Sequence, residues 1–420
     1  MYKKFILIGI IFVLCAGIAV AAVLFLFPYE PDQPPQADNT DSTKQGIQDV
    51  VNANNQFAFD LYSELDKYED GNMFYSPYSI SAALAMTYEG AEGQTAEEIK
   101  SVFHFPEDNI LRPNFAAIYN DINKGNEDYE LKTGNALWAQ KDFPFLPEYM
   151  SRVENYYGGK ATMLDFVEET EKSRQTINRF IEEQTNDKIK DLIPAGSLDK
   201  MTRLVLTNAI YFKGIWEWQF DKTDTREEIF RIDSSNTVET PMMNMNPKET
   251  KFNYAETDNL QILELPYKGE KISMLILLPT EDLNTIESIL TTEKLNEYKS
   301  QMKETEIDSI SLPKFEFDAK YFMNNTLSSL GMSKAFSGGA DFSGMTGKKD
   351  LFISSVIHQA YVGVDEEGTE AAAATAVIMT MGISLEPRKI FNADHPFIFV
   401  IQEKNTGNIL FLGRVIDPTK

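Results

Sequence analysis

Cysteine, histidine and positive charge are all scarce in this sequence of 420 residues. The single cysteine, Cys15, excludes disulfide bonds within the chain and excludes a thiol nucleophile from everything after it. His104, His358 and His395 are the only histidines, and neither G-x-S-x-G nor H-E-x-x-H occurs. With 39 basic against 64 acidic residues the net charge is -25, which repels phosphate backbones. We therefore expect neither an enzyme nor a nucleic-acid-binding protein, and no metal or other cofactor.

One long apolar run stands near the amino terminus. Lys3 and Lys4 precede an uncharged run over residues 5–27, which as a helix would reach roughly 35 Å and cross a bilayer. We expect residues 1–27 to be a membrane anchor; a cleaved signal peptide is the alternative, because Ala19 and Ala21 match a cleavage site. Lysines before the run and acids after it place the rest of the chain outside the cell. The expected location is the extracellular side of the cell membrane, or secretion if the segment is cleaved.

The rest of the chain divides into a short linker and one large domain. Residues 28–45 are rich in Pro, Asp and Asn and almost without large apolar residues, which is typical of an extended linker. Apolar residues then recur at helical spacing from Ile47, which predicts an amphipathic helix that ends near Gly71. No second linker or internal repeat follows, so we expect residues 46–420 to form one domain.

Strand and helix patterns together predict an α+β fold. Residues 204–212 are nearly all apolar, as in a strand buried on both faces, and helical patterns concentrate in the first half of the chain. Earlier, Ser76 caps a helix opened by Pro77, and Thr95 with Glu98 is expected to form a capping box for the next helix. Further strands are predicted at residues 261–265, 272–278, 309–312, 397–402 and 409–413.

Four strings of sequence, in this order, resemble the serpin family. They read NMFYSPYSISAALAMTYEGAEGQTAEEI (72–99), NAIYFKGIWEWQF (208–220), LPKF (312–315) and FNADHPFIFVI (391–401). The resemblance covers essentially everything after the linker. It implies the serpin fold, with a central mixed β-sheet, additional sheets, about nine helices and an exposed reactive-centre loop.

The stretch GVDEEGTEAAAATAVIMTMGISLEPRKIF (363–391) adds the hinge of an inhibitory serpin to this resemblance. As an extended strand it would turn every second residue from Thr369 to Met379, a small-to-apolar set, to one face. Taken alone, the alanine run predicts a helix or a linker; the flanking motifs favour a loop that inserts into a sheet. The hinge residues implied are Glu366, Glu367, Gly368, Thr369, Glu370, Ala371, Ala372, Ala373 and Ala374.

The resemblance also implies a reactive bond and two polar sites. The family's usual count gives Gly382–Ile383 as the reactive bond, and a count shorter by one gives Met381–Gly382. One site, the shutter, lies beneath the central sheet, and His358 in it has a core histidine as its alternative interpretation. The other, the breach, includes an expected ion pair between Lys314 and Glu366, for which a plain surface pair is the alternative. The shutter is Ser76, Ser79, Asn208 and His358; the breach is Trp216, Lys314 and Glu366.

The function implied is that of a monomeric protease inhibitor acting as a suicide substrate. Neither reactive-bond count places a basic residue before the cut, which disfavours trypsin-like targets. Chymotrypsin-, elastase- or subtilisin-like serine proteases are expected as partners, and a cysteine protease stays open. The alternative is a non-inhibitory serpin that binds a small ligand or a client protein, against which the small-residue hinge argues.

Overall fold

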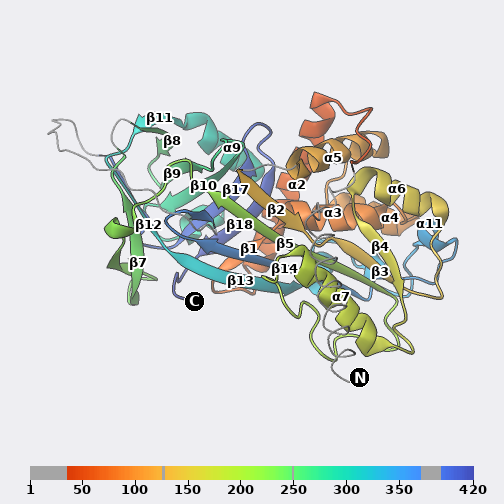
Figure 1. Ribbon diagram of the computed structural model, residues 1–420. Helices are drawn as coiled ribbons and strands as arrows, with labels where there is room; N and C mark the ends of the chain where they lie inside the picture. The colour runs from red at the N-terminus through yellow and green to blue at the C-terminus, as the bar shows by residue number, and fades with distance from the viewer. Residues whose placement is uncertain (1–35, 125–127, 248–249, 370–388) are drawn as a thin grey trace, which may run out of the picture. The chain divides into compact units, whose positions relative to one another are not determined.

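The computed structural model describes residues 36–124, 128–247, 250–369 and 389–420 (Figure 1). The chain divides into two units, Met1–Pro35 and Gln36–Lys420, and everything described lies in the second. The expected anchor (1–27), hinge residues 370–374 and both candidates for the reactive bond lie outside the described residues. In the described part of the chain, no helix has the length and apolar character needed to span a membrane.

Helices dominate the first half of the chain, as the sequence predicts. Six of the ten α-helices in the described ranges end before residue 185. The α-helices are α2 (Lys44–Leu65), α3 (Pro77–Tyr88), α4 (Gly93–Val102), α5 (Asp108–Asn123), α6 (Pro147–Tyr157), α7 (Thr170–Gln184), α8 (Asn284–Glu287), α9 (Thr292–Gln301), α10 (Asn324–Ser329) and α11 (Ser343–Thr346). Two short 3-10 helices, η1 (Lys222–Asp224) and η2 (Lys334–Phe336), are added to these.

The first helix differs from its predicted bounds at both ends. It begins at Lys44, where the Thr43 side chain accepts a hydrogen bond from the Gly46 backbone as its N-cap. It ends at Leu65 rather than near Gly71, because the residues that follow offer the core no buried apolar side chain; Tyr68 is 70% exposed. Part of the expected linker also packs on the domain: Ala37 is buried, and its backbone exchanges two hydrogen bonds of 2.8 Å with the Asn120 amide.

The capping box predicted at Thr95 and Glu98 is wrong. Helix α4 begins at Gly93, two residues before Thr95, and its N-cap residue Glu92 makes no side-chain cap. Thr95 is buried inside the helix and accepts from the Asp341 backbone N–H at 2.9 Å, while Glu98 accepts from the Lys334 N–H at 2.7 Å. Tertiary contacts therefore use the two side chains that the local pattern assigned to a cap. Ser76, in contrast, caps α3 as predicted, and Pro77 occupies its first turn.

Three sheets are present in the described residues, and each predicted strand is found in one of them. The central sheet has the order β13-β14-β15-β5-β3-β4, with β2 also paired to β5. Its strands are β2 (Tyr129–Thr133), β3 (Ala136–Gln140), β4 (Lys160–Leu164), β5 (Leu204–Ile215), β13 (Phe315–Phe322), β14 (Ser355–Val364) and β15 (Gly368–Thr369).

The other two sheets lie beyond one face and one end of the central sheet (Figure 1). One has seven strands in the order β1-β18-β17-β10-β9-β8-β11 and the other four in the order β16-β12-β7-β6. Their strands are β1 (Met73–Tyr75), β6 (Arg226–Arg231), β7 (Thr237–Met245), β8 (Lys251–Glu256), β9 (Leu260–Pro266), β10 (Ile272–Pro279), β11 (Lys303–Glu306), β12 (Ser309–Pro313), β16 (Ile390–Asn392), β17 (Phe397–Glu403) and β18 (Ile409–Val415).

Period-two alternation along β5 sends its side chains into two separate cores. Leu206, Ile210 and Phe212 face the large core shared with the second seven-stranded sheet. There the ring centroids of Phe212 and Phe411 lie 6.0 Å apart. Val205 and Ala209 face the smaller core beneath α7, which covers the opposite face of the sheet. The central strand is therefore buried on both faces, as its apolar sequence predicts.

Candidate functional site

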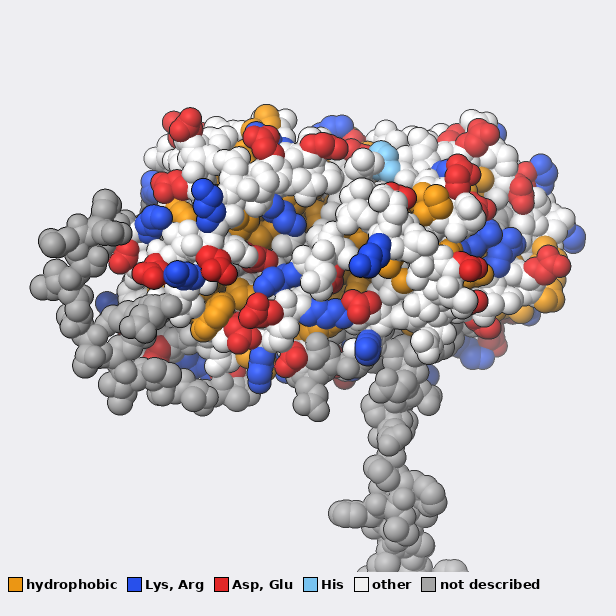
Figure 2. All heavy atoms as spheres, turned by 90° about the horizontal axis from the view of Figure 1, so that it is seen from above, with side chains coloured by type: hydrophobic (Ala, Val, Ile, Leu, Met, Phe, Trp, Pro, Cys, Tyr) orange, Lys and Arg blue, Asp and Glu red, His pale blue; other side chains and the backbone are white. Residues whose placement is uncertain are grey.

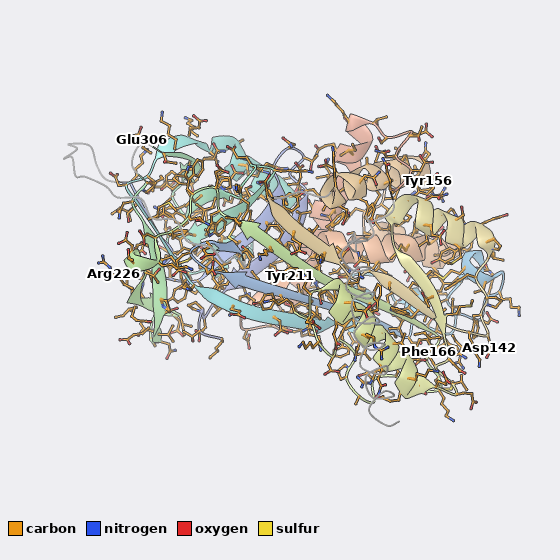
Figure 3. The ribbon with its side chains drawn as sticks, in the orientation of Figure 1. Asp142, Tyr156, Phe166, Tyr211, Arg226 and Glu306 are labelled. Carbon is orange, nitrogen blue, oxygen red and sulfur yellow. The ribbon has the colours of Figure 1, made fainter. Side chains whose placement is uncertain are left out.

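The two middle strands of the central sheet pair directly along one half and separate at the other. Residues 355–361 of β14 pair with residues 205–211 of β5, and beyond this ladder the two-residue strand β15 lies between them. Gly368 pairs with Ile215 of β5, and Thr369 pairs with both Gly214 of β5 and Val364 of β14. Two of the hinge residues, Gly368 and Thr369, thus already occupy the gap between β5 and β14. Tyr211 is the last residue of β5 that pairs directly with β14. In Figure 3 it lies between Phe166 on one side and Arg226 on the other.

Glycine is required at position 368 by close backbone approach. A Cβ atom there would lie 2.0 Å from the Gly214 carbonyl oxygen, a distance that no side chain tolerates. Thr369, beside it, is buried, and its hydroxyl lies 2.6 Å from the Tyr267 hydroxyl. The hinge therefore enters the sheet through a glycine that fits tightly and a threonine whose hydroxyl is satisfied.

The ion pair expected in the breach is present. Lys314 Nζ donates to Glu366 Oε2 at 2.8 Å, and the Thr225 hydroxyl donates to Glu366 Oε1 at 2.7 Å. Burial of Glu366 alone would raise its pKa, but these two hydrogen bonds and the lysine charge outweigh burial and lower the pKa. Glu366 is therefore an anchored carboxylate at the start of the hinge.

Trp216, the third breach residue, holds the hinge backbone. Its indole Nε1 donates to the Asp365 carbonyl at 3.0 Å, and its backbone N–H donates to the Glu367 carbonyl at 2.9 Å. Its ring stacks on Tyr267 with centroids 4.5 Å apart. The structure thus brings all three predicted breach residues to the place where β15 enters the sheet.

The four shutter residues also converge, at the ladder between β5 and β14. His358 of β14 lies opposite Asn208 of β5 in register, and its Nδ1 contacts Asn208 Oδ1. The Ser76 backbone N–H donates to His358 Nε2 at 3.1 Å, and Asn208 Nδ2 donates to Ser79 Oγ at 2.7 Å. The amino end of α3 therefore joins both strands through neutral hydrogen bonds.

His358 is uncharged in this cluster. Because Nε2 accepts from Ser76, the ring proton must lie on Nδ1, where it is donated to Asn208. Complete burial lowers the pKa of His358 to about 3. A neutral, fully bonded ring ties β14 to β5, and a protonated ring would have to break the bond to Ser76.

Asn135 is a member of the shutter that the sequence interpretation missed. It stands in the break between β2 and β3, the two short strands that pair with successive halves of β5. Its Oδ1 accepts from Asn208 Nδ2 at 2.6 Å and from Ser79 Oγ at 2.8 Å. The Gly-Asn pair at 134–135 was the available signal, since it interrupts two strand patterns.

A second missed residue is Lys222 of η1, whose ammonium contacts the Glu367 carboxylate. Glu367 is buried, whereas Lys222 is 55% exposed. That hydrogen bond is the main cause of the raised pKa of Lys222, which burial opposes. The site as a whole holds strands and orients carboxylates; within the described residues no group of three His, Cys, Asp or Glu side chains is placed to bind a metal.

Comparisons with known proteins agree with this architecture. The family model described as serpin (serine protease inhibitor) matches residues 52–418. A serpin-like protein of Methanosarcina acetivorans is 45% identical over 380 residues, covering 88% of each chain. Human leukocyte elastase inhibitor is 41% identical over 381 residues, covering 89% of this chain and 100% of that one. The crystal structure of human thyroxine-binding globulin with its ligand superposes with a TM-score of 0.81 at 31% identity, over 89% of this chain and 100% of that one. The chain therefore belongs to the serpin family.

Proposed function

We propose that this serpin is an extracytoplasmic serine protease inhibitor that acts as a suicide substrate. The serine hydroxyl of the target would attack the carbonyl of the reactive bond, and the amine side would leave as a new amino terminus. The acyl-enzyme so formed would be carried away as the loop enters the sheet as a new strand, before water reaches the ester. Serpins are in general inhibitors rather than enzymes, and the human relative is named for inhibition of an elastase.

One observation carries the proposal: Gly368 is already paired with β5, and Thr369 is already paired with both β5 and β14. A strand that continues from Thr369 would extend this pairing down the gap, and the sequence that follows it begins with Glu370 and four alanines. Alanine brings no bulky side chain between the two strands. Each added residue would gain ladder hydrogen bonds and bury apolar atoms, so insertion would release free energy from a fold held in a metastable state.

The target class and location are further parts of the proposal. Met381–Gly382 or Gly382–Ile383 as the cut bond suits chymotrypsin-, elastase- or subtilisin-like enzymes, because neither bond follows a basic residue. The apolar run at 5–27 supports an anchor or a signal segment. A chain starting at Gln36 keeps the packed Ala37 and the Thr43 cap, and we expect it to be soluble and inhibitory. A chain starting at Ile47 lacks both and should unfold more easily, which thermal unfolding of the two chains compares.

Thermal unfolding before and after limited proteolysis tests the mechanism. If mass spectrometry places the cut between Met379 and Leu385, we expect the melting temperature to rise steeply, and we expect a protease complex that survives denaturing gels. A cut at that place without a rise would refute inhibition by insertion while leaving the fold untouched. It would favour a ligand-binding serpin, the class to which thyroxine-binding globulin belongs by its name.

A further inference from the structure

The lysines that pair with two consecutive glutamates of the hinge come from opposite sides of the gap between β5 and β14. Glu366 pairs with Lys314, which immediately precedes β13, the neighbour of β14. Glu367 pairs with Lys222 of η1, in the segment that follows β5. The hinge therefore bridges the two strands that must part for insertion, with one lysine on each side.

The segment after β5 also holds the hinge backbone, carbonyl by carbonyl. The Phe220 N–H donates to the Glu366 carbonyl at 2.9 Å, in addition to the two bonds from Trp216 to Asp365 and Glu367. Three successive carbonyl groups are thus bound by residues 216–220, and Lys222 adds the side-chain contact. We call this set of contacts from residues 216–222 the β5 clasp.

We propose that Lys222 is a positioning residue for loop insertion, because its ion pair with Glu367 fixes the hinge to the β5 side of the gap. This inference rests on the proposed inhibitory function. The Glu367 side chain is only 4% exposed, so loss of the lysine leaves a buried carboxylate without that cation. Asp365, Glu366 and Glu367 are consecutive acids, and their mutual repulsion then favours release of the hinge. The β5 clasp opens, and β5 and β14 part more easily.

Uptake of a synthetic peptide measures this opening without any target protease. The probe is an acetylated peptide with the sequence of residues 369–380, offered to the uncut full chain, and uptake is followed by native electrophoresis and by the melting temperature. We expect Lys222→Gln to take up the peptide roughly five to ten times faster than the unaltered chain, within the usual range for coupled residues. Lys222→Arg restores the charge and should return the rate close to that of the unaltered chain.

A double-mutant cycle separates charge pairing from general damage. Glu367→Gln removes the charge with which Lys222 pairs, so Lys222→Gln with Glu367→Gln should take up the peptide more slowly than Lys222→Gln alone. Lys141→Gln is the matched control, because Lys141 pairs with Asp165 at 2.6 Å with a similar exposure of 51%, away from the gap. We expect this control to match the unaltered chain.

Each result decides between named alternatives. Equal rates for Lys222→Gln and Lys141→Gln would overturn the role of Lys222, provided that the unaltered chain takes up the peptide. An unaltered chain that neither takes up the peptide nor gains stability when its loop is cut would overturn the proposed function instead. If Lys222→Gln does not fold, Glu367→Gln tests the same pair, and a rate no faster than that of the unaltered chain would contradict the proposal.

Discussion

The shutter and the breach hold β5 and β14 in place in two different ways. The shutter consists of four buried, neutral side chains, those of His358, Asn208, Ser76 and Ser79. Each hydrogen bond among them has a fixed donor and a fixed acceptor. In the breach, Glu366 and Glu367 are buried, but their lysines are 38% and 55% exposed. A neutral buried network resists salt and fails as a unit, because each lost bond leaves another group unsatisfied. Partly exposed ion pairs are weaker and respond to the solvent. We therefore expect the shutter to hold the two strands firmly and the breach to hold them in a way that depends on the solvent.

The largest effect should come from a charge placed in the gap itself. Thr369→Arg puts a cation where the side chain is 1% exposed and bonded to Tyr267. Burying it without a partner costs several kcal/mol, so we expect a loop that is cut but not inserted, with at least a tenfold loss of covalent complex. Quantitative gels with a susceptible protease measure the ratio of complex to cleaved inhibitor. Thr369→Ser serves as control, and an undiminished yield from the arginine variant would disprove insertion through this point.

Asn208→Ala should be the most damaging single change in the shutter. It removes the acceptor of the His358 proton and the donor to Ser79 and Asn135. We expect an apparent loss of about 2 to 4 kcal/mol in urea unfolding, nearly the same at low and high salt, because the lost bonds are neutral and buried. A loss that fades with added salt would show that the shutter is held by charge after all.

The pH dependence of stability should report His358. Its pKa is lowered to about 3 in the folded chain, against about 6.5 when unfolded. The unfolded chain therefore gains a proton below pH 6.5 that the folded chain refuses, and this contribution to stability falls by about 1.4 kcal/mol per pH unit towards pH 3. The difference between the unaltered chain and His358→Gln isolates this slope, because other titrating groups are common to both. Parallel curves between pH 6.5 and 4 would contradict the neutral ring.

Lys314→Gln should have the smallest effect and the strongest salt dependence. The glutamine amide and Thr225 still offer hydrogen bonds to Glu366, so we expect about 1 kcal/mol of lost stability at low salt. At about 1 M salt the difference from the unaltered chain should shrink, since charge interactions at exposed sites are screened. Urea unfolding at two salt concentrations measures both values. A loss that is larger than that of Asn208→Ala, or independent of salt, would reverse the comparison between the two sites.

Sequence reasoning reached the residues that the family's motifs carry, and missed those that only the fold brings near. Ser76 and Asn208 belong to strings whose resemblance is specific, and the structure joins both residues to His358. The role of Asn135 was not predicted, because its partners are distant in sequence and the residues around it show only two weak strand patterns. The role of Lys222 was not predicted, because an exposed lysine in a polar turn carries no sequence signal of its partner. Thr95 and Glu98 show the converse, since a convincing local pattern yielded to contacts with Asp341 and Lys334.

The direction of the strands gives the gap a further property. β14 and β5 run parallel to each other, whereas β13 with β14 and β3 with β5 are antiparallel. A segment that returns from β14 through a tight turn runs opposite to both β14 and β5. The strand β15 is accordingly antiparallel to each of them. Parallel pairing is slightly the less stable of the two per residue. An entering strand would therefore replace one parallel interface by two antiparallel ones. The strand directions of the sheet thus favour insertion of a strand between β5 and β14.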